Sequence, residues 1–144
     1  MKNIFFALLI PLFLFGGCEK FKEPGDLKIT VSYYYNDFIG YKPDVGATAT
    51  LFEDETLRYD DYIEAAIGAI RLNEDDLLFP DYKAEADVNG IITIYDLPVG
   101  EYYLAIVSEG RFTYSEKVIT IPSGGALDLV KNFYYLHPFE RENW

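Results

Sequence analysis

The sequence predicts an all-β fold, a two-layer sandwich of seven antiparallel strands with one short crossover helix at about residues 60–72. Several runs of apolar and β-branched residues alternate with polar residues at a period of two, as strands with one buried face do. Turn-forming residues separate these runs, and a single segment carries apolar residues at helical spacing. Aromatic residues make up 17% of the chain, far more than disordered segments carry, so we expect it to fold.

The predicted strands begin at Leu27. Leu27, Ile29 and Val31 alternate with polar neighbours, which places the three aliphatic side chains on one buried face. Tyr102 and Leu104 share one parity on a later strand, so both are expected to point into the core. After the first strand at residues 27–35, the other predicted strands are residues 47–52, 83–87, 91–95, 101–108, 112–121 and 127–136.

The predicted helix lies between the second and third strands. Ile63, Ile67 and Ile70 recur at helical spacing after an acidic residue that can cap a helix, Asp60 or Asp61. We therefore expect a short crossover helix packed on the edge of a sheet.

The sequence predicts two turns in the second half of the chain. Asn89 and Gly90 form a dipeptide that adopts the positive φ angles of a tight turn, so residues 83–87 and 91–95 are predicted to pair as a hairpin. Pro98 and Gly100 mark the next reversal, before the strand at residues 101–108.

The N-terminus has the pattern of an export signal. Lys2 precedes a short apolar run, residues 4–15, which is well short of the ~20 residues that span a bilayer. Gly16, Gly17 and Cys18 follow, and this order resembles the signals of bacterial lipoproteins, in which small residues precede a cysteine that becomes diacylated. Phe15 departs from that pattern, because the position usually holds an aliphatic residue.

The resemblance implies four segments. These are a signal peptide at 1–17, a lipidated tether at 18–26, a sandwich domain at 27–137 and a C-terminal tail at 138–144. Cys18, the single cysteine of the chain, is the implied site of lipidation. The alternative is an ordinary cleaved signal followed by an unpaired thiol.

Residues 87–104 resemble a second group of proteins. An acidic residue, an Asn-Gly turn, an alternating strand, Leu-Pro-Val-Gly and a tyrosine-containing strand are similar to carboxypeptidase-regulatory-like and Cna-B-like domains. This resemblance implies a transthyretin-like, or prealbumin-like, sandwich of the immunoglobulin-like kind. Some Cna-B relatives carry a Lys–Asn isopeptide bond, and Lys28 and Asn132 lie on the first and last predicted strands. However, Lys28 is out of phase with the buried residues and is expected to face water, whereas the bond requires a dry core.

Composition excludes several chemistries. The formal net charge of −12 repels phosphate backbones, so nucleic acid is not an expected partner. His137 is the single histidine and lies near the C-terminus, which suits neither a catalytic triad nor a zinc site. The acidic groups lack the spacing of a calcium loop, so solvated turns are the simpler interpretation. We expect no enzymatic activity, metal or cofactor.

Tyrosine is the residue type that favours a binding role. Consecutive tyrosines on strands point to opposite faces, so one member of each pair must lie outside the core. Tyr34, Tyr103 and Tyr134 are the candidate ligand-binding residues, and on a shared face they would form an aromatic platform for a protein or a sugar. The alternative is that these rings only stabilise the sheets.

Together these features predict a non-enzymatic protein, lipid-anchored at the bacterial cell envelope. The outer membrane, on its periplasmic or its surface face, is the expected location. The sandwich is expected to act as a binding or structural module for a protein partner, with the lipid at Cys18 as the contact with the membrane. The alternative is a surface lipoprotein that binds carbohydrate through exposed tyrosines.

Overall fold

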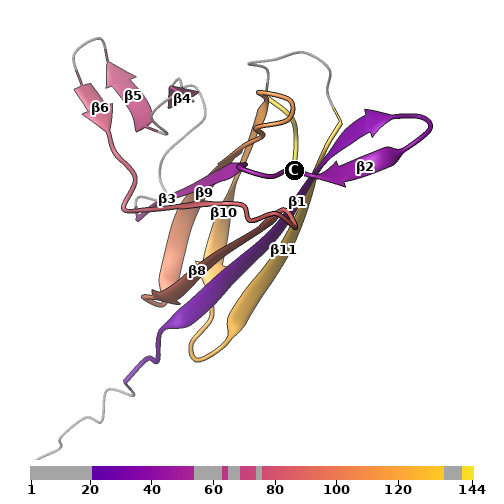
Figure 1. The fold of residues 1–144 in the computed structure, drawn as a ribbon. Coiled ribbons are helices and arrows are strands. Elements are labelled where there is room, and N and C mark those ends of the chain that lie inside the picture. The colour runs from indigo at the N-terminus through magenta and orange to yellow at the C-terminus, as the bar shows by residue number, and fades with distance from the viewer. Residues whose placement is uncertain (1–20, 54–62, 65–68, 74–75, 135–140) are drawn as a thin grey trace, which may run out of the picture.

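The computed structural model describes residues 21–53, 63–64, 69–73, 76–134 and 141–144. The regular elements within these ranges are the strands β1 to β11, arranged in three sheets (Figure 1), which confirms the all-β fold class. The described part of the chain contains no helix with the length and apolarity needed to span a membrane. The predicted signal peptide and Cys18 lie outside the described residues.

The first sheet is built around β1 (Gly25–Asn36), which begins two residues before the predicted start of the domain. β11 (Ala126–Phe133) pairs with β1 on one side, while β8 (Ile91–Leu97) and β2 (Gly40–Pro43) pair with its two halves on the other side. The β1–β11 pairing is parallel, so the prediction of an entirely antiparallel sandwich was wrong. Strand direction depends on how distant segments meet, which local patterns do not record.

The second sheet has the order β10-β9-β3-β7 and is antiparallel throughout. Its elements are β3 (Thr48–Phe52), β7 (Tyr82–Glu85), β9 (Gly100–Val107) and β10 (Tyr114–Ile121). Together with β1, β8 and β11, these strands account for all seven that the sequence predicted.

The main core lies between these two sheets. Leu27, Ile29 and Val31 are fully buried on one face of β1, as their alternation predicted. Tyr102 and Leu104 of β9 point into the same core, which confirms their predicted parity. Burial of each such side chain stabilises the fold by about 1.5–3 kcal/mol. The rest of the cluster includes Ala47, Ala49, Leu51, Ile92, Leu97, Ile106, Ile119, Ile121 and Phe133.

The turn at Asn89 and Gly90 forms, but the predicted hairpin does not. Gly90 has a φ of 74°, and the Asp87 carboxylate accepts the backbone N–H groups of Asn89 (2.8 Å) and Ile91 (2.9 Å). However, β7 pairs with β3 and β8 pairs with β1, so this turn carries the chain from one sheet to the other. The Asn-Gly pair predicts that the chain reverses its direction, but it does not predict which strands pair on either side of the turn.

A third, small sheet replaces the predicted helix at residues 60–72. Its strands are β4 (Ile63–Glu64), β5 (Ala69–Asn73) and β6 (Asp76–Leu78). Ile63 and Ile70, which the helical pattern placed on one face, are paired directly across the β4–β5 ladder. Ile70 is buried with Phe52, Tyr103 and Ala105 in a second cluster. Packing on the second sheet therefore overrides a weak helical pattern.

Candidate functional site

Three tyrosines meet on the outer face of the first sheet. The rings of Tyr34 and Tyr134 have centroids 4.8 Å apart, and those of Tyr34 and Tyr41 are 5.6 Å apart. Register explains the contact, because Tyr34 pairs with Tyr41 across β1 and β2, and the pairing of Tyr33 with Phe133 brings Tyr134 beside Tyr34. We call Tyr34, Tyr41 and Tyr134 the tyrosine cluster. Sequence reasoning missed Tyr41, because the short strand β2 was not predicted.

Tyr103 does not join this cluster. It lies on the second sheet, is 3% exposed and packs with Phe52, at 6.2 Å between ring centroids. The expectation that Tyr103 shares an open face with the other candidates was therefore wrong. Its parity does direct it away from the main core, but Ile70 and Leu78 of the third sheet pack over it. Tyr103 therefore points away from the main core and is still buried, because a second apolar layer covers it.

The hairpin between β1 and β2 presents apolar side chains to solvent. The Asn36 side-chain oxygen accepts the backbone N–H groups of Phe38 (3.0 Å) and Ile39 (2.8 Å), which is the geometry by which Asx residues order a turn. Phe38 is 98% exposed and Ile39 is more than half exposed. The Tyr34 hydroxyl donates a hydrogen bond to the carboxylate of Asp37 in the same turn. The tip is thus ordered from within, although its apolar groups are in water.

A buried carboxylate ties the neighbouring β9–β10 loop to this hairpin. Asp44 is fully buried and accepts hydrogen bonds from the Ser108 hydroxyl (2.5 Å) and the Gly110 backbone N–H (2.8 Å). Desolvation raises the pKa of Asp44, and the hydrogen bonds from Ser108 and Gly110 oppose that rise. From the same loop, Arg111 donates to the backbone carbonyl oxygens of Tyr34 and Tyr35.

Phe112, next in this loop, is exposed and has a φ of 55°. A positive φ is unusual for a bulky residue and costs on the order of 1–3 kcal/mol. Two backbone hydrogen bonds, from Phe112 to Ser108 (2.9 Å) and from Ser108 to Thr113 (2.8 Å), hold the loop closed. The loop is therefore built to keep Phe112 in this conformation.

These segments form one surface at the end of β1 that lies away from the chain's entry at Gly25 (Figure 1). We call it the distal surface. Its exposed or half-buried apolar side chains are the tyrosine cluster on the outer face of the first sheet, Tyr35 on the opposite face, where it packs against Tyr33, Phe38 and Ile39 at the hairpin tip, and Phe112 in the β9–β10 loop. Exposed apolar groups at one end of a domain are a mark of an interaction site.

A buried ion pair supports the surface from below. Lys131 is 3% exposed on β11, and its ammonium group lies 3.3 Å from the Glu142 carboxylate. Desolvation lowers the pKa of Lys131, and the charge of Glu142 raises it in part. The two carboxylate oxygens of Glu142 also accept the backbone N–H of Tyr134, at 3.1 and 2.9 Å. Sequence reasoning missed Lys131, although it shares the parity of Leu129 and Phe133.

Within residues 141–144, part of the C-terminal tail predicted at 138–144, Glu142 is therefore buried against the sandwich. Arg141 forms a bridge with Tyr114 of β10 and an ion pair with Glu116, at 2.7 Å. Glu116 is buried on the outer side of β10, and desolvation raises its pKa to about 7, against the opposing charge of Arg141. His137 lies outside the described residues.

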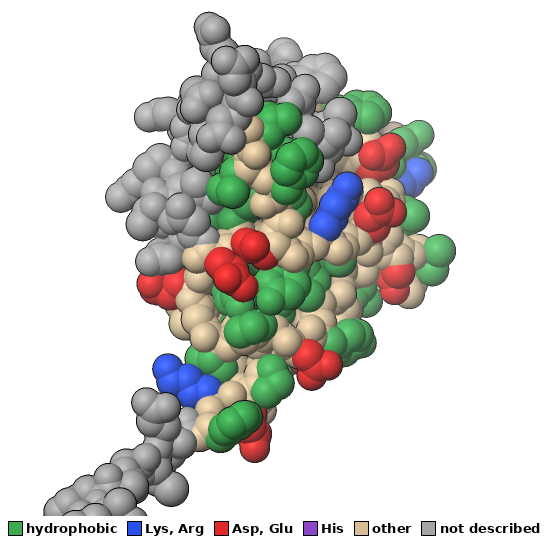
Figure 2. Space-filling model, turned by 90° about the vertical axis from the view of Figure 1, so that its left-hand side faces the viewer, with side chains coloured by type: hydrophobic (Ala, Val, Ile, Leu, Met, Phe, Trp, Pro, Cys, Tyr) green, Lys and Arg blue, Asp and Glu red, His purple; other side chains and the backbone are tan. Residues whose placement is uncertain are grey.

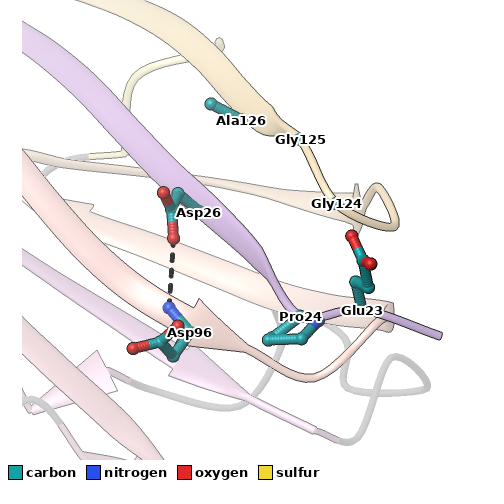
Figure 3. Close-up of a pocket in the computed structure, with 7 residues that line it drawn as sticks. All are labelled: Glu23, Pro24, Asp26, Asp96, Gly124, Gly125 and Ala126. Carbon is teal, nitrogen blue, oxygen red and sulfur yellow. Dashed lines mark hydrogen bonds between the residues drawn. The ribbon is translucent and has the colours of Figure 1, made fainter. Parts of the chain in front are cut away.

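The opposite end of the sandwich holds an open hollow of about 480 Å³ (Figure 3). Asp26 accepts the backbone N–H of Asp96 at 3.1 Å, while the carboxylates of Asp96 and Glu23 point in other directions (Figure 3). On the face that Figure 2 draws, acidic side chains lie at several separate places. Within the described ranges, no group of three or more His, Cys, Asp or Glu residues is placed to hold a metal ion.

The residues considered for an isopeptide bond lie apart in the ladder. Lys28 is exposed and pairs with Asp128, whereas Asn132 pairs with Ser32, whose hydroxyl donates to it at 2.6 Å. Each of the two therefore has a different cross-strand neighbour.

Several solved structures have a similar fold. The minor pilin GBS52 of Streptococcus agalactiae is 19% identical, with a TM-score of 0.50, and the match covers 78% of this chain and 44% of that one. PA1324 of Pseudomonas aeruginosa, a proposed carbohydrate-binding protein, is 14% identical, with a TM-score of 0.50 over 76% of this chain and 88% of that one. The major pilin SpaD of Corynebacterium diphtheriae is 13% identical, with a TM-score of 0.49 over 79% and 33%.

At such identities the likeness shows the fold alone. It is a β-sandwich like that of the pilin GBS52, consistent with the Cna-B-like and prealbumin-like fold that residues 87–104 resemble. The chain spans less than half of the length of GBS52. No family model matches the sequence, and no curated protein matches it.

Proposed function

We propose that this protein is a non-enzymatic, lipid-anchored binding module of the bacterial envelope, which holds a protein partner through its distal surface. The observation that carries the proposal is the side chain of Phe38, 98% exposed on a turn that the Asn36 side chain holds in place. An ordered aromatic group in water has no role in the free domain, whereas burial against a partner makes it an anchor.

Order within the free protein favours binding. Arg111 ties the β9–β10 loop to the end of β1, and Glu142 holds the backbone of Tyr134. Little conformational entropy is then lost when a partner docks, so more of the contact energy remains as affinity. Tyrosine, phenylalanine and arginine are also the side chains enriched at protein interfaces.

The proposed anchor directs the distal surface away from its own membrane. Residues 19–24 separate Cys18 from β1 and reach about 20 Å when fully extended. The 12 residues of β1 then extend roughly 40 Å further along the sandwich. A lipid at Cys18 thus keeps the entry end close to the bilayer and presents Phe38 to molecules beyond it.

Carbohydrate binding is the second candidate, and the likeness to PA1324 together with the exposed tyrosines favours it. The geometry of the rings favours a protein partner instead. Tyr34 makes angles of 41° with Tyr134 and 73° with Tyr41, and it packs against both. Sugars stack on open, flat ring faces, and these three rings do not form a flat platform. The pilin-like fold likewise supports a structural or binding role.

Photo-crosslinking tests the proposed partner. A benzophenone amino acid is placed at Phe38 of the full chain in the cells that produce it, with Tyr95 as the matched control because it is also largely exposed but lies on β8. We expect one dominant protein adduct from position 38. Once purified, that protein should bind the wild-type chain at least tenfold more tightly than the Phe38→Ser variant, with Tyr95→Ser unchanged.

Equal adducts from both positions, or equal affinity of both variants, would contradict the proposed site. A glycan array on the same proteins separates the second candidate, since glycan binding lost with Tyr134→Ala but kept in Phe38→Ser favours sugar. Mass spectrometry of the detergent-extracted protein tests the anchor. We expect an N-terminal diacylated Cys18, and a free thiol there would overturn it.

A further inference from the structure

Tyr34 and Tyr134 are placed for a covalent reaction with each other. Their ring centroids are 4.8 Å apart, and the planes are tilted by 41°. Tyr34 lies on β1 and Tyr134 directly follows β11, and the two are brought side by side because Tyr33 and Phe133 are register partners. Tyr134 is 56% exposed and Tyr34 is half-buried, so an oxidant in solvent reaches the pair through the Tyr134 ring.

A proton acceptor adjoins one of the two phenols. The Tyr34 hydroxyl donates a hydrogen bond to the Asp37 carboxylate, and this bond contributes most to raising the pKa of Tyr34 to about 12. Tyr34 is therefore a neutral phenol at neutral pH. Oxidation of a neutral phenol is easiest when its proton moves to a base as the electron leaves, and Asp37 is in position to receive it.

We propose that Tyr34 and Tyr134 form an oxidative coupling site, at which a one-electron oxidant such as a haem peroxidase intermediate generated from hydrogen peroxide joins the two rings as dityrosine. Each phenol loses one electron and its hydroxyl proton, which passes to Asp37 from Tyr34 and to water from Tyr134. The two radicals form a carbon–carbon bond between ring positions ortho to the oxygens. The hydrogens on those carbons then move to the oxygens, and the two electrons and two protons reduce peroxide to water.

The other tyrosine pairs are less suited to this reaction. Tyr82 and Tyr102 are 6.1 Å apart and edge-on, and Tyr102 is buried in the main core. Tyr33 and Tyr35 are 6.4 Å apart and belong to the same strand. Tyr41 is 5.6 Å from Tyr34 with its plane at 73°, which makes it the nearest competitor. Coupling is therefore expected mainly between Tyr34 and Tyr134.

The product would staple β11 to β1 at the base of the distal surface. A bond between Tyr34 and Tyr134 closes a loop of about 100 residues, and crosslinks around long loops restrict the unfolded chain most strongly. For a domain of this size the melting temperature should rise on the order of 10 °C. Such a bond would also preserve the arrangement of the rings in an oxidising envelope.

The test treats the full chain, dilute and in detergent, with hydrogen peroxide and a haem peroxidase. We expect a monomer that has lost two hydrogen atoms and shows dityrosine fluorescence, with the crosslink mapped by peptide mass spectrometry to Tyr34 and Tyr134. Tyr34→Phe and Tyr134→Phe should abolish it while folding normally, since each retains its ring. Tyr82→Phe should couple as the wild type does, and Asp37→Asn should couple several-fold more slowly.

Three outcomes would overturn the proposal. They are equal coupling in Tyr134→Phe and wild type, a crosslink mapped to another pair, and products that are exclusively intermolecular. Because hydroxyl loss leaves the aromatic packing in place, circular dichroism of the two phenylalanine variants distinguishes lost chemistry from lost fold.

Discussion

The outer faces of the two large sheets have similar alternating sequence patterns, but they differ in how far their side chains are exposed to water. On the first sheet, Thr30, Val130 and Tyr134 point away from the core and are exposed. On the second sheet, Phe52 and Tyr103 also point away from the core, yet Ile70 and Leu78 pack over them. The alternation of residues along each strand predicts which side chains point away from the main core. Whether they reach water depends on a layer contributed by a different part of the chain.

Charged residues on the outer faces of the two sheets differ in exposure in the same way. Lys28 and Asp128 face water on the first sheet, while Glu116 on the outer side of β10 is buried and its pKa is raised to about 7. One face is therefore available for binding, and the other has become a second core. Four predictions test this distinction, beginning with the largest expected effect.

Tyr103→Ala compared with Tyr134→Ala is the sharpest contrast. Truncation of the buried ring at position 103 should lower the free energy of unfolding by about 3–5 kcal/mol, because it leaves a cavity beside Phe52. The same change at Tyr134, which is exposed, should cost about 1 kcal/mol or less. Urea denaturation of both variants measures the difference, and equal losses would mean that the two faces are not distinct.

Glu142→Ala should give the next largest loss. It leaves the ammonium group of Lys131 buried without the opposite charge of Glu142, which we expect to lower the free energy of unfolding by about 3 kcal/mol. The double variant Lys131→Met with Glu142→Leu removes both charges and should recover most of this stability. If Glu142→Ala proved neutral in thermal denaturation, residues 141–144 would have no part in the fold.

Glu116 should make stability depend on pH. Its folded pKa of about 7 lies above the value of 4.5 for a free glutamate, so the folded state binds the proton more tightly. The contribution is fully present below about pH 4.5 and is lost as pH rises through about 7, by roughly 2 kcal/mol. Urea titrations across this range should show the decline in the wild type and a flatter profile in Glu116→Gln. Identical profiles would place the carboxylate in water.

Phe38→Ser should have the smallest effect on the fold. The side chain is 98% exposed, so the free energy of unfolding should change by no more than about 0.5 kcal/mol. The same substitution should weaken partner binding at least tenfold. A large loss of stability on calorimetry would show instead that the hairpin tip packs against the chain.

The sequence predicted those features that depend only on residues near one another in the chain. Alternation at Leu27, Ile29 and Val31 predicted the strand and its buried face, and the Asn89-Gly90 pair predicted a turn. Partners of strands were not predictable in this way, so the parallel β1–β11 pairing and the passage of β7 to β8 between sheets were missed. These depend on contacts between segments far apart in the chain.

The candidate site was predictable in part for the same reason. Tyr34 and Tyr134 were found by parity, and Tyr103 was misassigned because nothing in its own strand records the layer above it. Arg111 belongs to a turn without a repeating pattern, so its contacts with the carbonyl groups of Tyr34 and Tyr35 had no sequence signal. Lys131 did have one, since a lysine in phase with Leu129 and Phe133 on the core-facing side of a strand must find a partner.

Hydroxyl-radical footprinting of the full chain, purified and in the cells that produce it, tests the central claim most directly. In the purified protein, Phe38 and Tyr134 should be oxidised readily while Tyr103 is protected. In the cells, Phe38 and Tyr134 should become several-fold less reactive, with Tyr95 unchanged as the control. Equal reactivity of Tyr103 and Tyr134 in the purified protein, or no protection of Phe38 in the cells, would contradict the account.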